Sequence, residues 1–253
     1  MPEYTFDKIN HYSKYISSTE DKLCHRTLEK IKNILLNSGF TTSNSRSYED
    51  DEGLKYSYSL KDAKGNEFTF LVQGSYANGT CIRQDSDVDI AIISESTFSG
   101  KYRSGVSASN YGFVDSSFNV VQFKYELADI LQKNGFKPKV GNKCINVDFP
   151  ENSKKNFDIV PCLRYRDYSN DYWCNQNNYE AGTLIRTNKG EDIINYPEQS
   201  CRENINKNNS TNYYYKKVVR ILKNIKSDME EDGIQVISTD FFSEDEAPLL
   251  WRG

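Results

Sequence analysis

Hydrophobic residues recur along the chain with two different spacings. A spacing of three or four residues predicts amphipathic helices at about 4–38, 115–134 and 213–229. Shorter apolar or alternating runs predict strands at 56–60, 67–73, 88–93, 144–149 and 156–162. The chain is therefore expected to alternate between helices and strands, with polar segments between them.

Capping and turn residues indicate where these elements begin and end. Ser18 followed by Asp21 is a candidate capping box in the first helix, and Gly39 and Gly135 stand where helices are expected to end. The Asp62–Asn66 turn predicts a hairpin between the first two strands. The remaining polar stretches are expected to be irregular, namely a loop at 41–53, a mobile Ser- and Gly-rich loop at 94–110, and a long region at 163–212.

Candidate chemistry is concentrated between two of the predicted strands. Gly74 and Ser75 follow one strand, and Asp87 and Asp89 stand at the start of the next. Because alternate residues of a strand share a face, the two carboxylates are expected about 6–7 Å apart on one side. Divalent cations prefer such oxygen ligands, and the backbone of a glycine turn can direct N–H groups at a phosphate. This combination is typical of phosphoryl or nucleotidyl transfer. An Asp-rich surface turn or a calcium loop is the alternative.

Composition is that of a globular protein with room for one large domain or two small ones. Of the 253 residues, 37% are hydrophobic and 27% are charged. No stretch reaches the roughly 18 apolar residues of a membrane span, and the N-terminal segment has no signal-peptide core. We therefore expect a cytoplasmic protein with no membrane partner. The six cysteines are scattered without a C-x-x-C pair, which favours reduced thiols over a zinc site.

The net charge of −4 bears on the class of partner. Affinity for nucleic acid depends chiefly on neutralised phosphates, so this charge weighs against a large nucleic-acid footprint and against a nucleic-acid activator. It still permits a local basic groove. Small nucleotides are the better match.

The segment QGSYANGTCIRQDSDVDI, which contains Gly74, Ser75, Asp87 and Asp89, resembles the bacterial cGAS/DncV-like nucleotidyltransferases (CD-NTases). These are relatives of the oligoadenylate synthetases within the polymerase-β-like superfamily. The resemblance implies an α+β fold, with a polymerase-β-like palm of mixed sheet and flanking helices, a long N-terminal helix, and a C-terminal helical half. We accordingly expect a catalytic core at 1–165 and a helical region at 166–253.

The resemblance also implies two Mg²⁺ ions, for which Mn²⁺ could substitute, held by Asp87, Asp89 and a third carboxylate from a later strand. Asp158, between apolar neighbours in NFDIVPC, matches that position, and Asp148 in the adjoining predicted strand competes with it. An Asp inside an apolar strand is costly to bury unless a cation or hydrogen bonds compensate. This cost favours a metal beside Asp158.

For nucleotide binding, the resemblance implies that Gly74 and Ser75 hold the donor triphosphate and that a lysine of the C-terminal helix contacts it. Lys223 is the better match and Lys217 the second. An ammonium group there would neutralise β/γ-phosphate charge without bidentate geometry. The helix has an apolar stripe and a separate polar face. The stripe contains Val218, Ile221, Leu222 and Ile225, and the polar face contains Lys216, Arg220, Lys223 and Ser227.

Other positions carry weaker signals. Tyr76, Tyr165 and Tyr172 are candidate stacking platforms for bases. Ser200 and Cys201 stand where relatives often carry a histidine.

The resemblance is good from about Phe6 to Ile225 and poor beyond. Ser243 falls roughly where a phosphate-contacting serine is expected, in surroundings that match poorly. A naturally short chain, a truncated one, and one completed by another chain are the alternatives.

The implied activity joins nucleoside triphosphates (ATP, GTP, UTP or CTP) into a cyclic di- or trinucleotide. Such a product would be a second messenger in antiphage (CBASS) signalling, with CBASS accessory proteins as candidate partners. Two alternatives stay open, namely nucleotide transfer to a small molecule, protein or tRNA end, and non-catalytic nucleotide binding.

Overall fold

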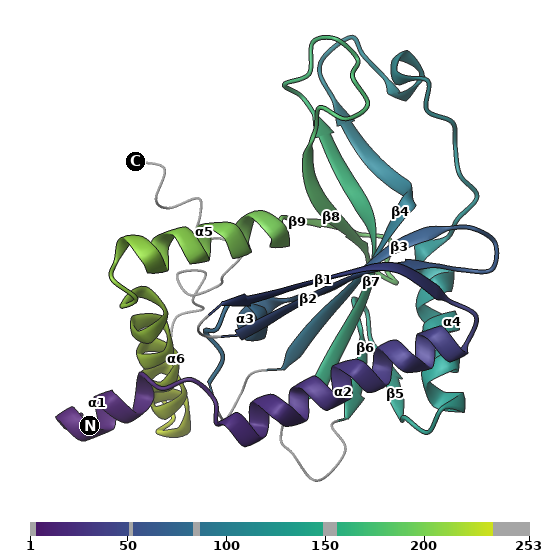
Figure 1. Cartoon of the computed structure of the whole chain (residues 1–253). Helices are drawn as coiled ribbons and strands as arrows, with labels where there is room; N and C mark the ends of the chain where they lie inside the picture. Colours follow the sequence, from purple (N-terminus) through teal and green to yellow (C-terminus); the bar gives the residue numbers. More distant parts are fainter. Residues whose placement is uncertain (1–3, 51–52, 83–86, 149–155, 235–253) are drawn as a thin grey trace.

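The computed structural model describes residues 4–50, 53–82, 87–148 and 156–234. Helices and strands alternate along this part of the chain, as the hydrophobic pattern predicts (Figure 1). The helices are α1 (Phe6–Tyr12), α2 (Ser18–Asn37), α3 (Gly74–Ala77), the 3-10 helix η1 (Ala108–Tyr111), α4 (Val120–Lys133), α5 (Pro197–Ser210) and α6 (Tyr215–Glu231). The strands are β1 (Thr41–Asp50), β2 (Gly53–Lys61), β3 (Glu67–Gln73), β4 (Val88–Tyr102), β5 (Pro138–Val140), β6 (Ile145–Asp148), β7 (Asn156–Tyr168), β8 (Glu180–Arg186) and β9 (Asp192–Asn195).

The strands form one mixed sheet in the order β1-β2-β3-β4-β7-β6-β5, and β8 and β9 extend it from β7. Strands β1 to β4 pair antiparallel in sequence order. Strands β4 and β7 are parallel neighbours, and the connection between them contains α4, β5 and β6, since a parallel pair requires a crossover. Two segments that are far apart in the sequence thus lie side by side in the middle of the sheet.

Helices α2 and α4 cover one face of the sheet and form the main core with it (Figure 1). Leu28, Ile31 and Leu35 of α2 are buried, as their helical spacing predicts, and so are Phe70 and Ile90 of the central strands. Burial of each such side chain contributes about 1.5–3 kcal/mol. This packing holds the central strands in place behind the opposite face, which is where the acidic residues lie.

The N-terminal segment contains two helices rather than the single one predicted. Helix α1 ends at Tyr12, and Ser17 caps α2: its Oγ accepts a hydrogen bond from the N–H of Glu20 at 3.3 Å, and the Glu20 carboxylate accepts one from the N–H of Ser17 at 3.0 Å. The capping box predicted at Ser18 and Asp21 was therefore wrong by one residue. The break between the helices follows from this cap, because the Ncap residue is extended.

Several segments predicted to be irregular are strands. Residues 41–50 pair with β2, β4 continues past its predicted end to Tyr102, and β8 and β9 occupy part of the region at 163–212. In the outer halves of β4 and β7, the ring of Tyr102 stacks on that of Tyr168 with centroids 5.6 Å apart, so this part is held by packing. Neighbouring strands rather than apolar alternation stabilise these segments. The predicted boundary at 165 lies inside β7, and the helices that follow the sheet begin at Pro197.

Helix α6 turns its polar face inward. Lys216 and Arg220 are 3% and 2% exposed, whereas Val218 is 48% exposed. Arg220 donates hydrogen bonds to the carbonyl of Ser13 at 2.7 Å and to that of Gly79. Its guanidinium therefore joins α6 to the α1–α2 connection and to the turn that follows α3. The apolar stripe identified in the sequence is not the most buried face of this helix.

Two further expectations concern thiols and membranes. The six cysteines are free, and Cys24, Cys81 and Cys162 are buried. None of the helices within the described ranges is both long and apolar enough to cross a membrane.

A buried ion network attaches α5 to the sheet. Arg164 of β7 is 6% exposed. It pairs with Glu95 of β4 at 2.6 Å and with Glu198 of α5 at 2.8 Å, and it also donates to the carbonyl of Gly182 on β8. The guanidinium of Arg164 thus connects β7 to β4, α5 and β8. Without it, the carboxylates of Glu95 and Glu198 would lose their cation.

We expect Arg164→Ala to lower the free energy of unfolding by about 3 kcal/mol, at the lower end of the range for broken buried pairs because both carboxylates are partly exposed. Urea denaturation followed by circular dichroism measures this change. Lys101→Ala, which removes the exposed partner of Asp167, is the matched control and should cost no more than about 1 kcal/mol. Equal losses in the two variants would contradict the assignment.

Candidate active site

Four strands bring polar residues into one row across the middle of the sheet, called here the carboxylate row: Gln73, Asp89, Asp158 and Asn146. Gln73 of β3 is the Cα partner of Asp89 on β4. Asp89 is the partner of Asp158 on β7, and Asp158 of Asn146 on β6. Neighbouring strands lie about 4.8 Å apart, so Asp89 and Asp158 stand side by side. Because the alternate positions on these strands are buried against α2 and α4, the carboxylates lie on the other face of the sheet.

Gly74 is the residue against which Asp89 rests. Its φ of +69° lies in the left-handed region, which glycine adopts without steric cost. A Cβ here would overlap Oδ2 of Asp89 and lie 3.0 Å from its Cγ. The carbonyl of the next residue, Ser75, accepts a hydrogen bond from the N–H of Thr80 at 2.9 Å and closes the turn. The close contact between turn and carboxylate therefore depends on the absence of a side chain at Gly74.

Two neighbours hold Asp158, and the sequence analysis missed both. Asn146 donates from Nδ2 to Oδ1 of Asp158 at 2.8 Å. Burial, together with the charge of Asp158 and a hydrogen bond to it, raises the pKa of the Cys144 thiol to about 11, so this thiol stays protonated near neutral pH and donates to the carboxylate. Cys144 and Asn146 alternate with apolar residues in CINV, and this spacing was the one signal that they share a face.

The other two predicted acids behave differently. Asp87 lies directly before β4, and its Oδ1 accepts a hydrogen bond from the backbone N–H of Asn156 at 3.0 Å. Asp148 is exposed at the end of β6 and pairs with Lys139 at 3.1 Å. The structure thus brings Asp89 and Asp158 together, keeps Asp87 next to them with its carboxylate engaged, and places Asp148 elsewhere.

A pocket of about 230 Å³ opens over the carboxylate row. It is lined by Gln73, Gly74, Asn78, Asp89, Lys143, Cys144, Asp158, Val160, Ile185, Asn195, Pro197 and Ser200. Small-molecule sites usually enclose about 300–1,000 Å³. The pocket is therefore matched to the reacting groups of a ligand rather than to a whole nucleotide.

The chemistry of the carboxylate pair fits a divalent cation. Carboxylate oxygens are hard ligands, and adjacent carboxylates repel unless a cation lies between them. Asp89 packed on Gly74 and Asp158 held by Asn146 both line one pocket. Across the described ranges, no three His, Cys, Asp or Glu side chains are close enough to hold a metal ion together. The third predicted ligand, Asp87, accepts a hydrogen bond from the backbone N–H of Asn156 at 3.0 Å.

The two lysines predicted to contact phosphate lie on different sides of α6. Lys223 is half-buried and lies two turns from the buried Lys216, on the inward face. Lys217 is exposed, with its ammonium 5.4 Å from the ring centroid of Tyr214. Neither lysine lines the pocket over the carboxylate row.

Two of the three candidate stacking tyrosines are unsuited to that role. Tyr76 and Tyr165 are 1% and 5% exposed, and the hydroxyl of Tyr76 donates to Asp21 at 2.9 Å. Both belong to the protein core. Tyr172 is exposed, in the loop after β7, with the guanidinium of Arg103 over its ring.

The remaining predicted positions are at the C-terminal side. Ser200 lines the pocket from α5, and Cys201 beside it is half-buried. Ser243 lies outside the described residues.

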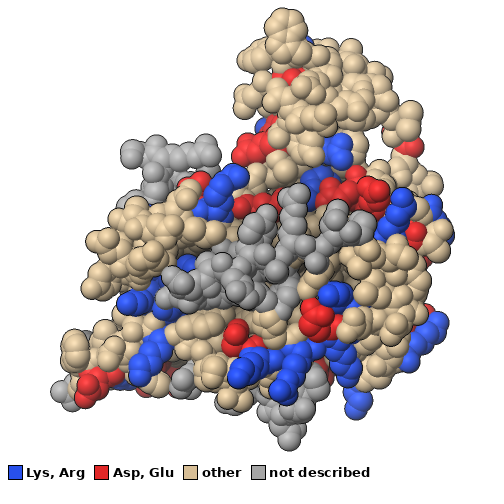
Figure 2. All heavy atoms as spheres, viewed as in Figure 1, with Lys and Arg blue, Asp and Glu red and all other residues tan. Residues whose placement is uncertain are grey.

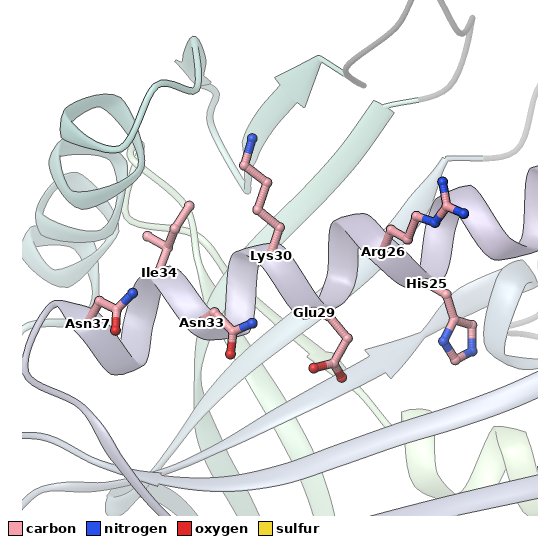
Figure 3. A pocket seen from close by; sticks show the side chains of 7 residues that line it. All are labelled: His25, Arg26, Glu29, Lys30, Asn33, Ile34 and Asn37. Carbon is pink, nitrogen blue, oxygen red and sulfur yellow. The ribbon is translucent and has the colours of Figure 1, made fainter.

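A separate depression of about 540 Å³ lies on the outer surface of α2 (Figure 3). Arg26 and Lys30 line it, and lysine and arginine side chains gather along this helix despite the negative net charge (Figure 2). Its acidic member, Glu29, accepts hydrogen bonds from Tyr58 and Lys32. All of its lining residues come from one helix, and it contains no carboxylate pair, so it does not compete with the carboxylate row as a catalytic site.

Comparison with known families agrees with this geometry. Residues 59–160 match the nucleotidyltransferase domain, and residues 202–244 match the cGAS/DncV-like nucleotidyltransferase C-terminal helical domain. The first match contains the carboxylate row and the Gly74 turn, and the second contains α6.

Individual relatives point the same way. The chain is 41% identical over 226 residues to the cyclic GMP-AMP synthase CdnE03 of Staphylococcus schleiferi, covering 88% of this chain and 69% of that one. It is 34% identical over 164 residues to the cyclic dipyrimidine nucleotide synthase CdnE of Cecembia lonarensis, covering 64% and 53%.

The structure resembles that of the Rhodothermus marinus CdnE c-UMP-AMP synthase with Apcpp and Upnpp, with a TM-score of 0.68 and 24% identity over 92% of this chain and 70% of that one. This similarity confirms the predicted α+β fold of mixed sheet and flanking helices with a C-terminal helical part. The identity to the S. schleiferi synthase also confirms the predicted enzyme class. The chain therefore belongs to the bacterial cGAS/DncV-like nucleotidyltransferases.

Proposed function

We propose that this nucleotidyltransferase joins nucleoside triphosphates into a cyclic di- or trinucleotide. The observation that carries the proposal is the in-register pair Asp89 and Asp158, set against the Gly74 turn in one pocket. A carboxylate pair beside a glycine turn suits the transfer of a nucleotidyl group, because it places metal ligands next to backbone groups that can hold phosphate.

Nucleotidyltransferase domains depend on divalent metal in general. Two Mg²⁺ or Mn²⁺ ions held by Asp89, Asp158 and Asp87 would supply the positive charge that lowers the pKa of an attacking hydroxyl and neutralises the donor triphosphate. Asp87 would join the other two by giving up its hydrogen bond from Asn156.

Residues of the chain would position the donor phosphates and the Asp158 carboxylate. The backbone at Gly74 and Ser75 would hold the β- and γ-phosphates of the donor, and Asn146 and Cys144 keep Asp158 oriented. A hydroxyl oxygen of the acceptor nucleotide attacks the α-phosphorus, the bond from that phosphorus to the bridging oxygen breaks, and pyrophosphate leaves. The hydroxyl proton passes to Asp158 or to water. A second transfer of the same kind closes the ring of a dinucleotide, and a trinucleotide requires a third.

The product is proposed as a class rather than as one compound. The relatives named above include a cyclic GMP-AMP synthase, a cyclic dipyrimidine nucleotide synthase and a c-UMP-AMP synthase, so purine and pyrimidine triphosphates are both candidate substrates. We propose that the product acts as a second messenger in antiphage (CBASS) signalling, with CBASS accessory proteins as partners.

The acidic pair is tested by Asp89→Asn and Asp158→Asn. Each should reduce product formation on the order of 10³-fold or more, because several kcal/mol of metal-assisted stabilisation would be lost. Mass spectrometry of reactions that contain all four nucleoside triphosphates and Mg²⁺ or Mn²⁺ measures this loss and identifies the product.

Asp148→Asn is the matched control and should keep wild-type activity, because Asp148 pairs with Lys139 on the surface. Full turnover in Asp158→Asn would refute the site. A nucleotide attached to protein or tRNA, in place of a free cyclic product, would favour the acceptor alternative.

Gly74→Ala tests the contact between turn and carboxylate. The new Cβ must displace Asp89, so we expect activity to fall roughly 100-fold or more while the fold persists, with a stability loss of about 1–3 kcal/mol from strain at positive φ. Product assays and thermal unfolding measure the two effects. Gly65→Ala, also at positive φ but with open space around its Cβ beyond Lys61, controls for strain and should remain active.

Lys223→Ala is expected to raise the nucleotide concentration needed for half-maximal rate by roughly 10-fold, as loss of one charge-assisted phosphate contact predicts. Lys217→Ala should have a smaller effect, because Lys217 lies on the outward side of α6. Steady-state assays with varied nucleoside triphosphate compare the two variants. A larger effect at Lys217 would reverse the assignment.

A further inference from the structure

The carboxylate row has two unlike ends. At the β3 end, the Gly74 turn approaches Asp89 with backbone atoms. At the β6 end, the Cα partner of Asn146 is Lys139 of β5, and the turn at 141–144 leads into β6 with Lys143 and Cys144, which both line the pocket. Among the described residues that line this pocket, Lys143 is the one cation. No ion pair joins Lys143 to another residue within the described ranges, and it is exposed.

The buried ammonium group of Lys124 holds the turn that contains Lys143. Lys124 of α4 is 2% exposed and donates from Nζ to the carbonyl oxygens of Gly141 at 3.3 Å and Asn142 at 2.8 Å. The turn is also closed on itself, because the N–H of Gly141 donates to the carbonyl of Cys144 at 2.8 Å. A fully buried lysine is rare unless paired. Here the carbonyl oxygens of a pocket-lining turn are its partners.

Asn188 also donates hydrogen bonds to the carbonyl groups of Gly141 and Asn142. Asn188, in the connection from β8 to β9, donates from its backbone N–H to Asn142 at 3.1 Å and from Nδ2 to Gly141 at 3.1 Å. The two carbonyl oxygens thus each accept hydrogen bonds from Lys124 and from Asn188. These four hydrogen bonds fix the backbone directly before Lys143.

We infer that Lys143 binds a phosphate of the second, acceptor nucleotide, and that Lys124 is a positioning residue for it. This rests on the proposed function, because two nucleotides must then meet over Asp89 and Asp158. The donor phosphates occupy the Gly74 end of the row, so the acceptor approaches from the β6 end, where Lys143 is the available cation. A lysine provides a point charge for phosphate without demanding one geometry.

Kinetics test the contact. Lys143→Ala should raise the half-saturating concentration of nucleoside triphosphate roughly 10-fold or more, with a smaller change in kcat, and Lys143→Arg should restore most of the loss. Lys139→Ala, which removes a cation from the same hairpin but pairs with Asp148 on the surface, is the matched control and should change neither value. Unchanged half-saturation in Lys143→Ala would overturn the inference.

The positioning role is tested by a double-mutant cycle with Lys124→Met, which keeps side-chain volume and removes the charge. If Lys124 acts through Lys143, the double variant should be no worse than Lys143→Ala alone. Losses that multiply would contradict the positioning role. Thermal unfolding shows whether Lys124→Met folds, and the exposed Lys143→Ala variant tests the contact in either case.

Binding separates this inference from the proposed function, since it requires no turnover. Calorimetric titration with a non-hydrolysable ATP analogue should give two nucleotides per wild-type chain, and in Lys143→Ala one of the two sites should bind roughly 10-fold or more weakly. Two sites of unchanged affinity in the variant, or one site in the wild type, would overturn the inference, whereas absence of product from a wild type with two sites would count against the proposed function alone.

Discussion

The parallel pairing of β4 with β7 is the constraint on which the site depends. In register, it makes Asp89 and Asp158 direct neighbours although they are far apart in the sequence. Two carboxylates at that spacing repel each other, so the pairing must be maintained by other contacts. Apolar residues on the reverse side of both strands, buried against α2 and α4, supply them. The core therefore holds together a charge arrangement that is unfavourable by itself, and this is what makes the pair available to a cation.

The arrangement of α6 reflects a second constraint, the hydrogen bonds that its buried polar face makes with neighbouring backbone. An ordinary amphipathic helix buries its apolar stripe, yet α6 buries Lys216 and Arg220 and leaves Val218 half-exposed. The cost of burying a guanidinium is offset by the carbonyls of Ser13 and Gly79, which accept its hydrogen bonds. Movement of the turn after α3 would break the hydrogen bond from Arg220 to Gly79, so this bond couples the position of the turn to that of the helix.

The sequence could predict those features that depend on residues close together in the chain. The spacing of Leu28, Ile31 and Leu35, and the alternation of Asp87 and Asp89 with apolar residues, are short-range patterns and predicted a helix and a strand face that the structure contains. The segments at 41–50 and 94–102 are strands because of their partners, and no local pattern records a partner. The same holds for Asn146, whose contact with Asp158 exists through the pairing of β6 with β7.

Lys124 shows most clearly how the two ends of the carboxylate row differ. In the sequence it is one polar residue beside an apolar stripe, and nothing nearby indicates that its ammonium is buried. Burial lowers the pKa of Lys124, and the carbonyl oxygens of Gly141 and Asn142 offset that cost because they accept from the charged form. At the β3 end, the missing side chain of Gly74 allows the turn to approach Asp89 closely. The β6 end instead requires a charged group inside the protein to hold its turn, so its geometry depends on the contact between Lys124 of α4 and the carbonyl groups of that turn.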